Sequence, residues 1–343
     1  MLSTKNYSVK DLLDITNPCV LFPNDLDEAK ELYKRLAFVT HPDKNHDKLS
    51  GQAFAHIKNL YDEAILLIEK GTWKIPGVLE FIDDYKRKYK INYKKTHPFE
   101  LGQMYINNSL IAYHVDAKYK QLFINAINRI TLFEYKSDRM KEEMSRYLPV
   151  IKFNTKLSDG SYLLILQKTP DVLLLKDVLD YYNRTSYPEF WDRHVAWMQS
   201  KLYNIMCYMH LYGIVHNSIS EETVFISPEF HSICLYGGWW YAVKENTKMI
   251  SVPAKLYNLI PPAVKVSKMA SYTTDMELSK ALSRECLKKV TAPVPFTNWL
   301  KFSSGETPAK EFKTWQEKVL IDSYGKRKFI ELKLTGDMIY EKE

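Results

Sequence analysis

The sequence predicts an α+β protein of more than one domain, in which a helical hairpin comes first, followed by a strand-rich segment and then a mainly helical one. The length of 343 residues corresponds to about two domains of ordinary size. Apolar residues recur at helical intervals between residues 26 and 69, whereas strand-like runs begin near residue 109. With 45% apolar and 26% charged residues, the composition excludes disorder for most of the chain.

The first strong helical pattern covers residues 26–40. Its apolar stripe consists of Leu26, Ala29, Leu32, Tyr33, Leu36 and Ala37. Asn24 or Asp25 is expected to cap its start, because a side-chain oxygen there accepts hydrogen bonds from the first free N–H groups. The helix must end before Pro42, since the residue preceding a proline is pushed out of the α region.

A second helix is expected from about Gly51 to Glu69, with Gly71 as its C-terminal stop. A polar loop from His41 to Ser50 joins the two helices, so they are expected to pack as an antiparallel hairpin. A short additional helix is expected earlier, around residues 10–15.

The loop between the two helices contains His41-Pro42-Asp43. This tripeptide between two such helices resembles the J domain of DnaJ-type co-chaperones, and the resemblance covers about residues 8–70. In that family, the loop and the preceding basic helix face dock on a DnaK-type (heat-shock seventy) chaperone and promote its ATP hydrolysis. The resemblance implies a chaperone-binding set consisting of Lys34, Arg35, His41, Pro42, Asp43 and Lys44.

The chemistry of these residue types suits docking. Pro42 rigidifies the loop, and Asp43 can form a charge-assisted hydrogen bond with a partner arginine. Lys34 and Arg35 supply positive charge that steers the protein onto an acidic surface. The alternative is that the tripeptide is an ordinary polar turn.

Residues 72–98 are expected to form a basic linker. Within it, residues 85–95 contain six basic residues, no acidic ones and three tyrosines. Lysines and tyrosines together can bind phosphates and stack on bases, so Lys86–Lys95 is a candidate nucleic-acid interface. We favour a solvated helix end and linker, because charge runs usually are solvated. The net charge of +7 is a weak argument for an acidic partner.

From about residue 99 the pattern changes. Strands are expected at residues 109–117, 121–130, 151–157 and 161–168, the last two joined by an Asp159-Gly160 turn. Helices are expected at residues 137–147, 173–182 and 190–212. Gly213 is expected to stop the longest helix.

The run GIVHNSISEETVFISPEFHSICLYGGWW, residues 213–240, follows that long helix. In order and spacing it resembles the catalytic region of protein kinases, where a loop follows a long helix and two short strands lead to Asp-Phe-Gly. His216 matches the loop histidine, and Gly238 stands at the end of the Asp-Phe-Gly site. The other positions differ from the kinase pattern: Ser218 replaces the catalytic aspartate, Ser220 the lysine, Thr223 the metal-binding asparagine and Tyr236 the magnesium-binding aspartate. Asn125 aligns with the lysine of the third strand, and Asp275 with the structural aspartate that braces the loop.

The resemblance implies a bilobal domain with a small antiparallel β lobe and a larger, mainly α lobe. The expected boundaries are 1–71 for the J domain, 72–98 for the linker, 99–170 and 171–335 for the small and large lobes, and 336–343 for a tail.

Phosphoryl transfer requires a positioning carboxylate, a lysine on the phosphates and oxygen ligands for magnesium. Hydroxyls such as those of Ser218 and Thr223 cannot replace these groups. We therefore expect a pseudokinase, which is not an enzyme and holds no cofactor or metal. The alternative is an unorthodox active Ser/Thr kinase that uses ATP and magnesium through migrated residues, with Asp116, Asp171 and Asp180 as candidates.

The sequence pattern argues against several common classes of protein. No run of 18 apolar residues occurs and no secretory signal is evident, so we expect no membrane partner. Four scattered cysteines predict a reducing, cytoplasmic setting without disulfides or a zinc site. Kinase-like J proteins occur in bacteria and their large phages, and a viral protein would work in the host cytoplasm.

These observations predict a co-chaperone adaptor. Its J domain is expected to recruit and stimulate a DnaK-type chaperone, and its kinase-like domain to bind an unknown client or partner protein. The alternatives are the unorthodox kinase and a nucleic-acid-associated J protein.

Overall fold

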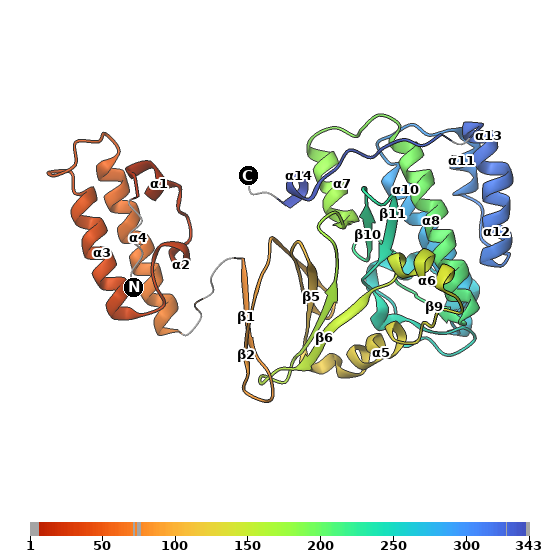
Figure 1. The fold of residues 1–343 in the computed structure, drawn as a ribbon, viewed down its shortest axis with the longest axis horizontal. Helices are drawn as coiled ribbons and strands as arrows, with labels where there is room; N and C mark the ends of the chain where they lie inside the picture. Colours follow the sequence, from red (N-terminus) through yellow and green to blue (C-terminus); the bar gives the residue numbers. More distant parts are fainter. Residues whose placement is uncertain (1–6, 71–72, 74–76, 327, 341–343) are drawn as a thin grey trace. The chain divides into compact units, whose positions relative to one another are not determined.

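The computed structural model describes residues 7–70, 73, 77–326 and 328–340. These residues form a mixed α/β protein that separates into two compact units (Figure 1). The first unit comprises the residues up to Phe81 together with Tyr89–Tyr93, and the second comprises Ile82–Lys88 and the residues from Lys94 onwards.

The first unit contains the two expected helices, α3 (Leu26–Thr40) and α4 (Ser50–Glu69), which pack against each other. Asp25 caps α3, because its carboxylate accepts hydrogen bonds from two N–H groups of the first turn at 3.0 and 2.9 Å. His41 is the C-cap, directly before the proline, as expected. Gly71, the expected stop of α4, lies outside the described residues.

Two short helices, α1 (Val9–Asp14) and α2 (Pro18–Leu21), pack on α4 and confirm the early helix near residues 10–15. Ser8 and Asp11 form a capping box at the start of α1. The buried core of this unit consists of Leu12, Leu21, Phe22, Ala29, Leu36, Ile57, Leu60 and Ala64. Its α3 members, Ala29 and Leu36, belong to the apolar stripe read from the sequence.

The expected linker of residues 72–98 is wrong for its described part, which forms strands. β1 (Val78–Ile82) pairs with β2 (Lys88–Asn92), and β3 (Lys95–Phe99) belongs to the larger sheet of the second unit. Lysines alternate with apolar residues here, so Tyr89 stacks on Phe81 at 4.9 Å while Lys90 pairs with Glu80 at 2.9 Å. The basic run is therefore strand, and the expected solvated helix end is absent from the described part of it.

The second unit contains a five-stranded antiparallel sheet in the order β3-β4-β5-β7-β6. The remaining strands are β4 (Gly102–Ile106), β5 (Leu110–Val115), β6 (Val150–Lys156) and β7 (Tyr162–Gln167). Gly160, with φ +88°, forms the expected turn between β6 and β7. The sheet begins at Lys95, four residues before the expected boundary.

The strand expected at residues 121–130 is instead a helix, α5 (Lys120–Ile130), preceded by the 3-10 turn η1 (Ala117–Tyr119). Its buried residues are Phe123, Ala126 and Ile130, spaced by three and four. The run was wrongly assigned because it is rich in the β-favouring residues Phe and Ile. A second helix, α6 (Asp138–Met144), lies within the range expected for a helix, is capped by Ser137 and runs into η2 (Ser145–Tyr147).

The larger part of this unit is mainly helical. Its helices are α7 (Leu175–Arg184), α8 (Trp191–Leu211), α9 (Pro262–Ser267), α10 (Tyr272–Cys286), α11 (Val294–Trp299), α12 (Pro308–Thr314), the π-helical turn η5 (Trp315–Val319) and α13 (Leu320–Tyr324). Its short strands are β8 (Leu173–Leu174), β9 (Ile214–Val215), β10 (Val224–Ser227), β11 (Ser232–Leu235) and β12 (Val243–Lys244). The 3-10 turns are η3 (Trp239–Tyr241) and η4 (Ala254–Leu259).

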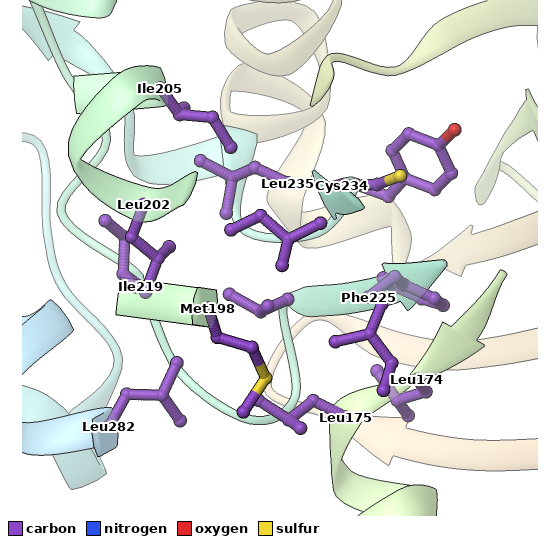
Figure 2. Close-up of a cluster of buried hydrophobic side chains, with 14 of the residues drawn as sticks. Leu174, Leu175, Met198, Leu202, Ile205, Ile219, Phe225, Cys234, Leu235 and Leu282 are labelled. Atoms are coloured by element: carbon purple, nitrogen blue, oxygen red, sulfur yellow. The ribbon is translucent and has the colours of Figure 1, made fainter. Parts of the chain in front are cut away.

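Helix α8 lies at the centre of this part and buries side chains along most of its length. Met198, Leu202 and Ile205 of α8 pack with residues of β8, β10, β11 and α10 in one continuous core (Figure 2). Cys234 is buried in this core, whereas Cys207 is only partly buried.

The segment expected as a tail from residue 336 contains a helix, α14 (Gly336–Tyr340), which packs on α7. Ile339 and Tyr340 are buried, which explains why this segment is ordered against the fold. The Tyr340 hydroxyl accepts a hydrogen bond of 3.0 Å from the N–H of Leu174. Residues 341–343 lie outside the described range.

Candidate functional site

The loop between α3 and α4 is held in shape by its own polar groups. The carbonyl of His41 accepts hydrogen bonds from the N–H groups of Lys44 and Asn45, both at 2.9 Å. The Asn45 side chain donates to the carbonyl of Val39 at 3.0 Å and accepts from the N–H of Asp47. These bonds fix the loop relative to the end of α3.

The side chains of the tripeptide differ in whether they pack on the hairpin or lie in solvent. The His41 ring packs edge-on against Phe54 of α4 at 5.5 Å, and its Nδ1 accepts a hydrogen bond from the N–H of Asp43 at 3.2 Å. Pro42 is exposed, and 86% of the Asp43 side chain is accessible. The histidine is therefore anchored to the hairpin, while the carboxylate is presented to solvent.

The basic residues that the sequence singled out lie on the exposed surface of α3 and the loop. Lys34 and Arg35 are exposed, and the hydrogen bond and charge of Glu31 raise the pKa of Lys34 above its usual value. Lys44 places its Nζ 3.4 Å from the centroid of the Phe38 ring. A cation over an aromatic face is attracted by the ring quadrupole.

Phe38 was not among the expected site residues, yet it is 61% exposed beside the loop. Its neighbour Val39 is 54% exposed. Both residues fall outside the apolar stripe of α3, and that position is the sequence signal that could have identified them. Apolar and cationic side chains therefore share the surface beside the loop.

A second cluster of expected site residues lies in the loop after β9. The Asp275 carboxylate of α10 accepts hydrogen bonds from the N–H groups of His216 and Asn217 at 2.7 and 2.8 Å. Burial raises the pKa of Asp275 to about 7, an effect that these two N–H groups oppose. These hydrogen bonds confirm the expectation that Asp275 braces this loop.

The glycine pair after β11 packs tightly on this loop. His216 Nε2–H donates to the carbonyl of Gly237 at 2.9 Å, and burial lowers the pKa of His216 to about 3, so the ring is neutral. Gly238 has φ +81°, and a Cβ there would lie 2.6 Å from His216 Cε1. Only glycine permits this approach.

A cavity of about 260 Å³ lies between the sheet and this loop. Ser218, Ser220, Thr223 and Gly238 line it, so the structure brings four of the expected positions together. The Thr223 hydroxyl donates to the carbonyl of Ser218 at 2.6 Å, which ties the two ends of the loop.

Other expected positions lie outside the described lining of this cavity. Tyr236 packs against Phe225, and His216 lies behind Gly238. Asn125 lies on α5 rather than on a strand, and its amide donates to the carbonyls of Trp240 and Ala242 at 3.0 and 2.8 Å. Its placement at a third-strand lysine position is therefore wrong.

Three aromatic rings fill one side of the cavity. Phe99, Tyr113 and Trp240 lie 5.3–5.8 Å apart in a mutual cluster. Trp240 is buried and also lines the cavity. The Tyr113 hydroxyl is buried without a hydrogen-bond partner in the described part of the chain.

The two carboxylates in the lining are both engaged. Glu100 accepts hydrogen bonds from the Tyr241 hydroxyl at 2.7 Å and from the N–H of Ala254 at 2.6 Å. Glu222 pairs with Lys255 at 2.7 Å. A carboxylate held in this way is not free to coordinate a cation without breaking these contacts.

The aspartates considered as migrated catalytic residues do not enter the described lining of the cavity. Asp171 accepts hydrogen bonds from Thr169 and Ser227, while Asp116 and Asp180 are exposed. Within the described ranges, no three His, Cys, Asp or Glu side chains gather as a metal site.

No family model matches the chain, and no curated protein matches it at a significant level. Among the helices that the structure describes, none combines the length and apolar character needed to cross a bilayer.

Proposed function

We propose that this protein is a DnaJ-type co-chaperone that recruits and stimulates a DnaK-type chaperone. The observation that carries the proposal is the His41-Pro42-Asp43 loop, which presents an exposed carboxylate beside the exposed cations Lys34 and Arg35. The carboxylate suits a partner arginine, and the cations suit an acidic docking surface.

The test is the steady-state ATPase rate of a DnaK-type chaperone in the presence of the full-length protein. The variant His41→Gln is expected to abolish stimulation, because its ring anchors the loop on Phe54. The matched control is His46→Gln, an exposed histidine of the same loop, which should stimulate normally. Circular dichroism checks that both variants fold. Full stimulation by His41→Gln contradicts the proposal.

We further propose that the second unit is a protein-kinase-like domain that binds a client or partner protein rather than transferring phosphate. The support is a small antiparallel sheet, a helix after its third strand, and a braced loop that follows a long helix. In kinases the nucleotide lysine lies on the third strand and its glutamate partner on the next helix. Here the third strand, β5, contains no lysine, and the following helix carries Asn125.

The residues of this cavity do not fit magnesium nucleotide. Hydroxyls occupy the loop positions, the carboxylates Glu100 and Glu222 already have partners, and an aromatic cluster takes up space beside the sheet. Two magnesium ions need free anionic ligands, and the two carboxylates of the described lining are engaged, although Lys176 and Lys255 add positive charge there. The proposal therefore contains no catalytic step.

The second test is thermal unfolding of the full-length protein with ATP, in the presence and absence of magnesium. A ligand at ten times its dissociation constant adds about 1.4 kcal/mol of stability, which is readily seen. No shift is expected under either condition. A magnesium-dependent shift contradicts the pseudokinase proposal and favours the unorthodox Ser/Thr kinase.

A further inference from the structure

A groove of about 360 Å³ lies between α8 and the helices α12–α13, away from the two sites described above. Arg193, Trp197 and Lys201 of α8 form one wall, at intervals of four residues, and therefore share one helix face. Leu320 and Tyr324 of α13 form the opposite wall. The groove thus lies between two helix surfaces.

The charge of the groove is of one sign. Arg193, Lys201, Lys326 and Lys328 line it, and no carboxylate is among the described residues of its lining. None of the four forms an ion pair within the described part of the chain. Arg193 lies 4.8 Å from the centroid of the Tyr324 ring, and the Lys201 ammonium donates to the Tyr147 hydroxyl at 3.4 Å.

One carboxylate, that of Asp192, lies near Tyr324 but outside the described lining; burial, together with this carboxylate, raises the pKa of Tyr324. The described lining itself carries four cations and no anion. Charges of one sign in a concave, low-dielectric channel reinforce one another and concentrate ligands of the opposite sign.

Two aromatic side chains of the groove already have one face covered by a neighbouring ring. The His231 ring covers Trp197 at 4.1 Å with the two planes 11° apart, and Phe312 stacks on Tyr203 at 5.8 Å. Single-stranded nucleic acids bind such proteins by stacking bases on open aromatic platforms. The groove therefore favours an anionic chain without bases.

The polar groups of the groove suit a peptide backbone. Asn204 and Gln316 line its two walls and are partly exposed, and neither amide forms a hydrogen bond within the described residues. A carboxamide both donates and accepts, so it can bond the N–H and carbonyl groups of an extended peptide.

We propose that this groove binds an extended acidic peptide segment of a partner protein, whose carboxylates pair with Arg193, Lys201, Lys326 and Lys328. The planar guanidinium of Arg193 can hold a carboxylate with two hydrogen bonds, and the lysines act as point charges along the channel. This binding does not rest on chaperone stimulation, because the groove and the His41 loop belong to different units.

The test is fluorescence anisotropy of the full-length protein with a fluorescein-labelled octaglutamate peptide at about 0.1 M salt, where distant surface charges are largely screened. An octaglutamine peptide measures binding without charge, and an oligothymidine of equal length measures nucleic-acid binding. The groove variants are Arg193→Gln with Lys201→Gln, and Lys326→Gln with Lys328→Gln. The control is Lys118→Gln with Lys120→Gln, two exposed lysines that lie outside the groove.

Octaglutamate should bind, octaglutamine should not, and each groove variant should weaken octaglutamate binding about tenfold. The control variant should change it less than about twofold. Equal weakening by control and groove variants, or no octaglutamate binding, overturns the proposal. Tighter binding of oligothymidine, sensitive to the groove variants, overturns it in favour of nucleic acid.

Discussion

The carboxylate of Asp275 accepts a hydrogen bond of 2.7 Å from the backbone N–H of His216, although 59 residues separate them in the sequence. Neither side chain is accessible to solvent. This bond connects α10 to the loop that lines the cavity, so the shape of the cavity depends on a residue outside its lining.

Removing this bond should destabilise the second unit. Asp275→Ala leaves two buried N–H groups without acceptors, and each such group costs about 1–3 kcal/mol. The free energy of unfolding should therefore fall by roughly 2–5 kcal/mol. Urea unfolding followed by tryptophan fluorescence measures the change, because six of the seven tryptophans lie in this unit. The exposed Asp180→Ala is the control, and an equal effect of both variants refutes the assignment.

Three glycines form a graded series for alanine substitution. Gly305→Ala should be neutral, because a Cβ there meets no atom within 4 Å and the backbone is not left-handed. Gly213→Ala should cost about 1 kcal/mol for its left-handed φ of +62° alone. Gly238→Ala should cost roughly 2–4 kcal/mol, since a clash with His216 adds to the same strain. Unfolding midpoints in urea should fall in this order, and any other order contradicts the close packing on His216.

Acid should destabilise the fold through His216. Burial lowers the pKa of His216 from 6.5 to about 3, so below pH 6.5 the unfolded chain takes up a proton that the folded protein refuses. The contribution of neutral His216 to the free energy of unfolding is therefore present in full above about pH 6.5 and is lost as the pH falls below it. Relative to His216→Gln, wild type should lose about 2 kcal/mol more between about pH 7 and pH 5. The raised pKa of Asp275 acts in the opposite direction but is common to both proteins and cancels in the comparison.

The cations of α3 should affect docking more than maximal stimulation. Replacing Lys34 and Arg35 by glutamine should raise the protein concentration needed for half-maximal ATPase stimulation about tenfold, because steering is lost. The maximal rate should remain unchanged, and the difference from wild type should shrink at high salt. The control replaces Lys58 and Lys70 of the α4 region by glutamine. If both pairs shift the curve equally, net charge rather than the α3 face is responsible.

Helices α3 and α4 could be predicted from sequence because their signals are local. Spacing, the Asp25 cap and Pro42 all indicate the same boundaries. Helix α5 could not, because its Phe and Ile favour a strand locally and only packing against η3 and β6 selects the helix.

The candidate sites also differ in whether local sequence signals reveal them. The loop from His41 to Asp43 is one short segment, so its residues were found together. The cavity joins Phe99, Tyr113 and Trp240 from distant parts of the chain, and no local pattern indicates that they meet. The basic run of β2 and β3 was misread because charge dominates its composition, although each strand pairs with a neighbour in the sequence, β2 with β1 and β3 with β4.

The hydrogen bond between Leu174 and Tyr340 gives biosynthesis of this protein a fixed order. Leu174 leaves the ribosome 166 residues before the tyrosine that satisfies its buried N–H. The helices of the first unit can complete their packing early, because N-terminal domains generally fold while synthesis continues. Until α14 has emerged, this N–H bonds water, and the segment between β7 and α7 gains its buried hydrogen bond only once that helix is made.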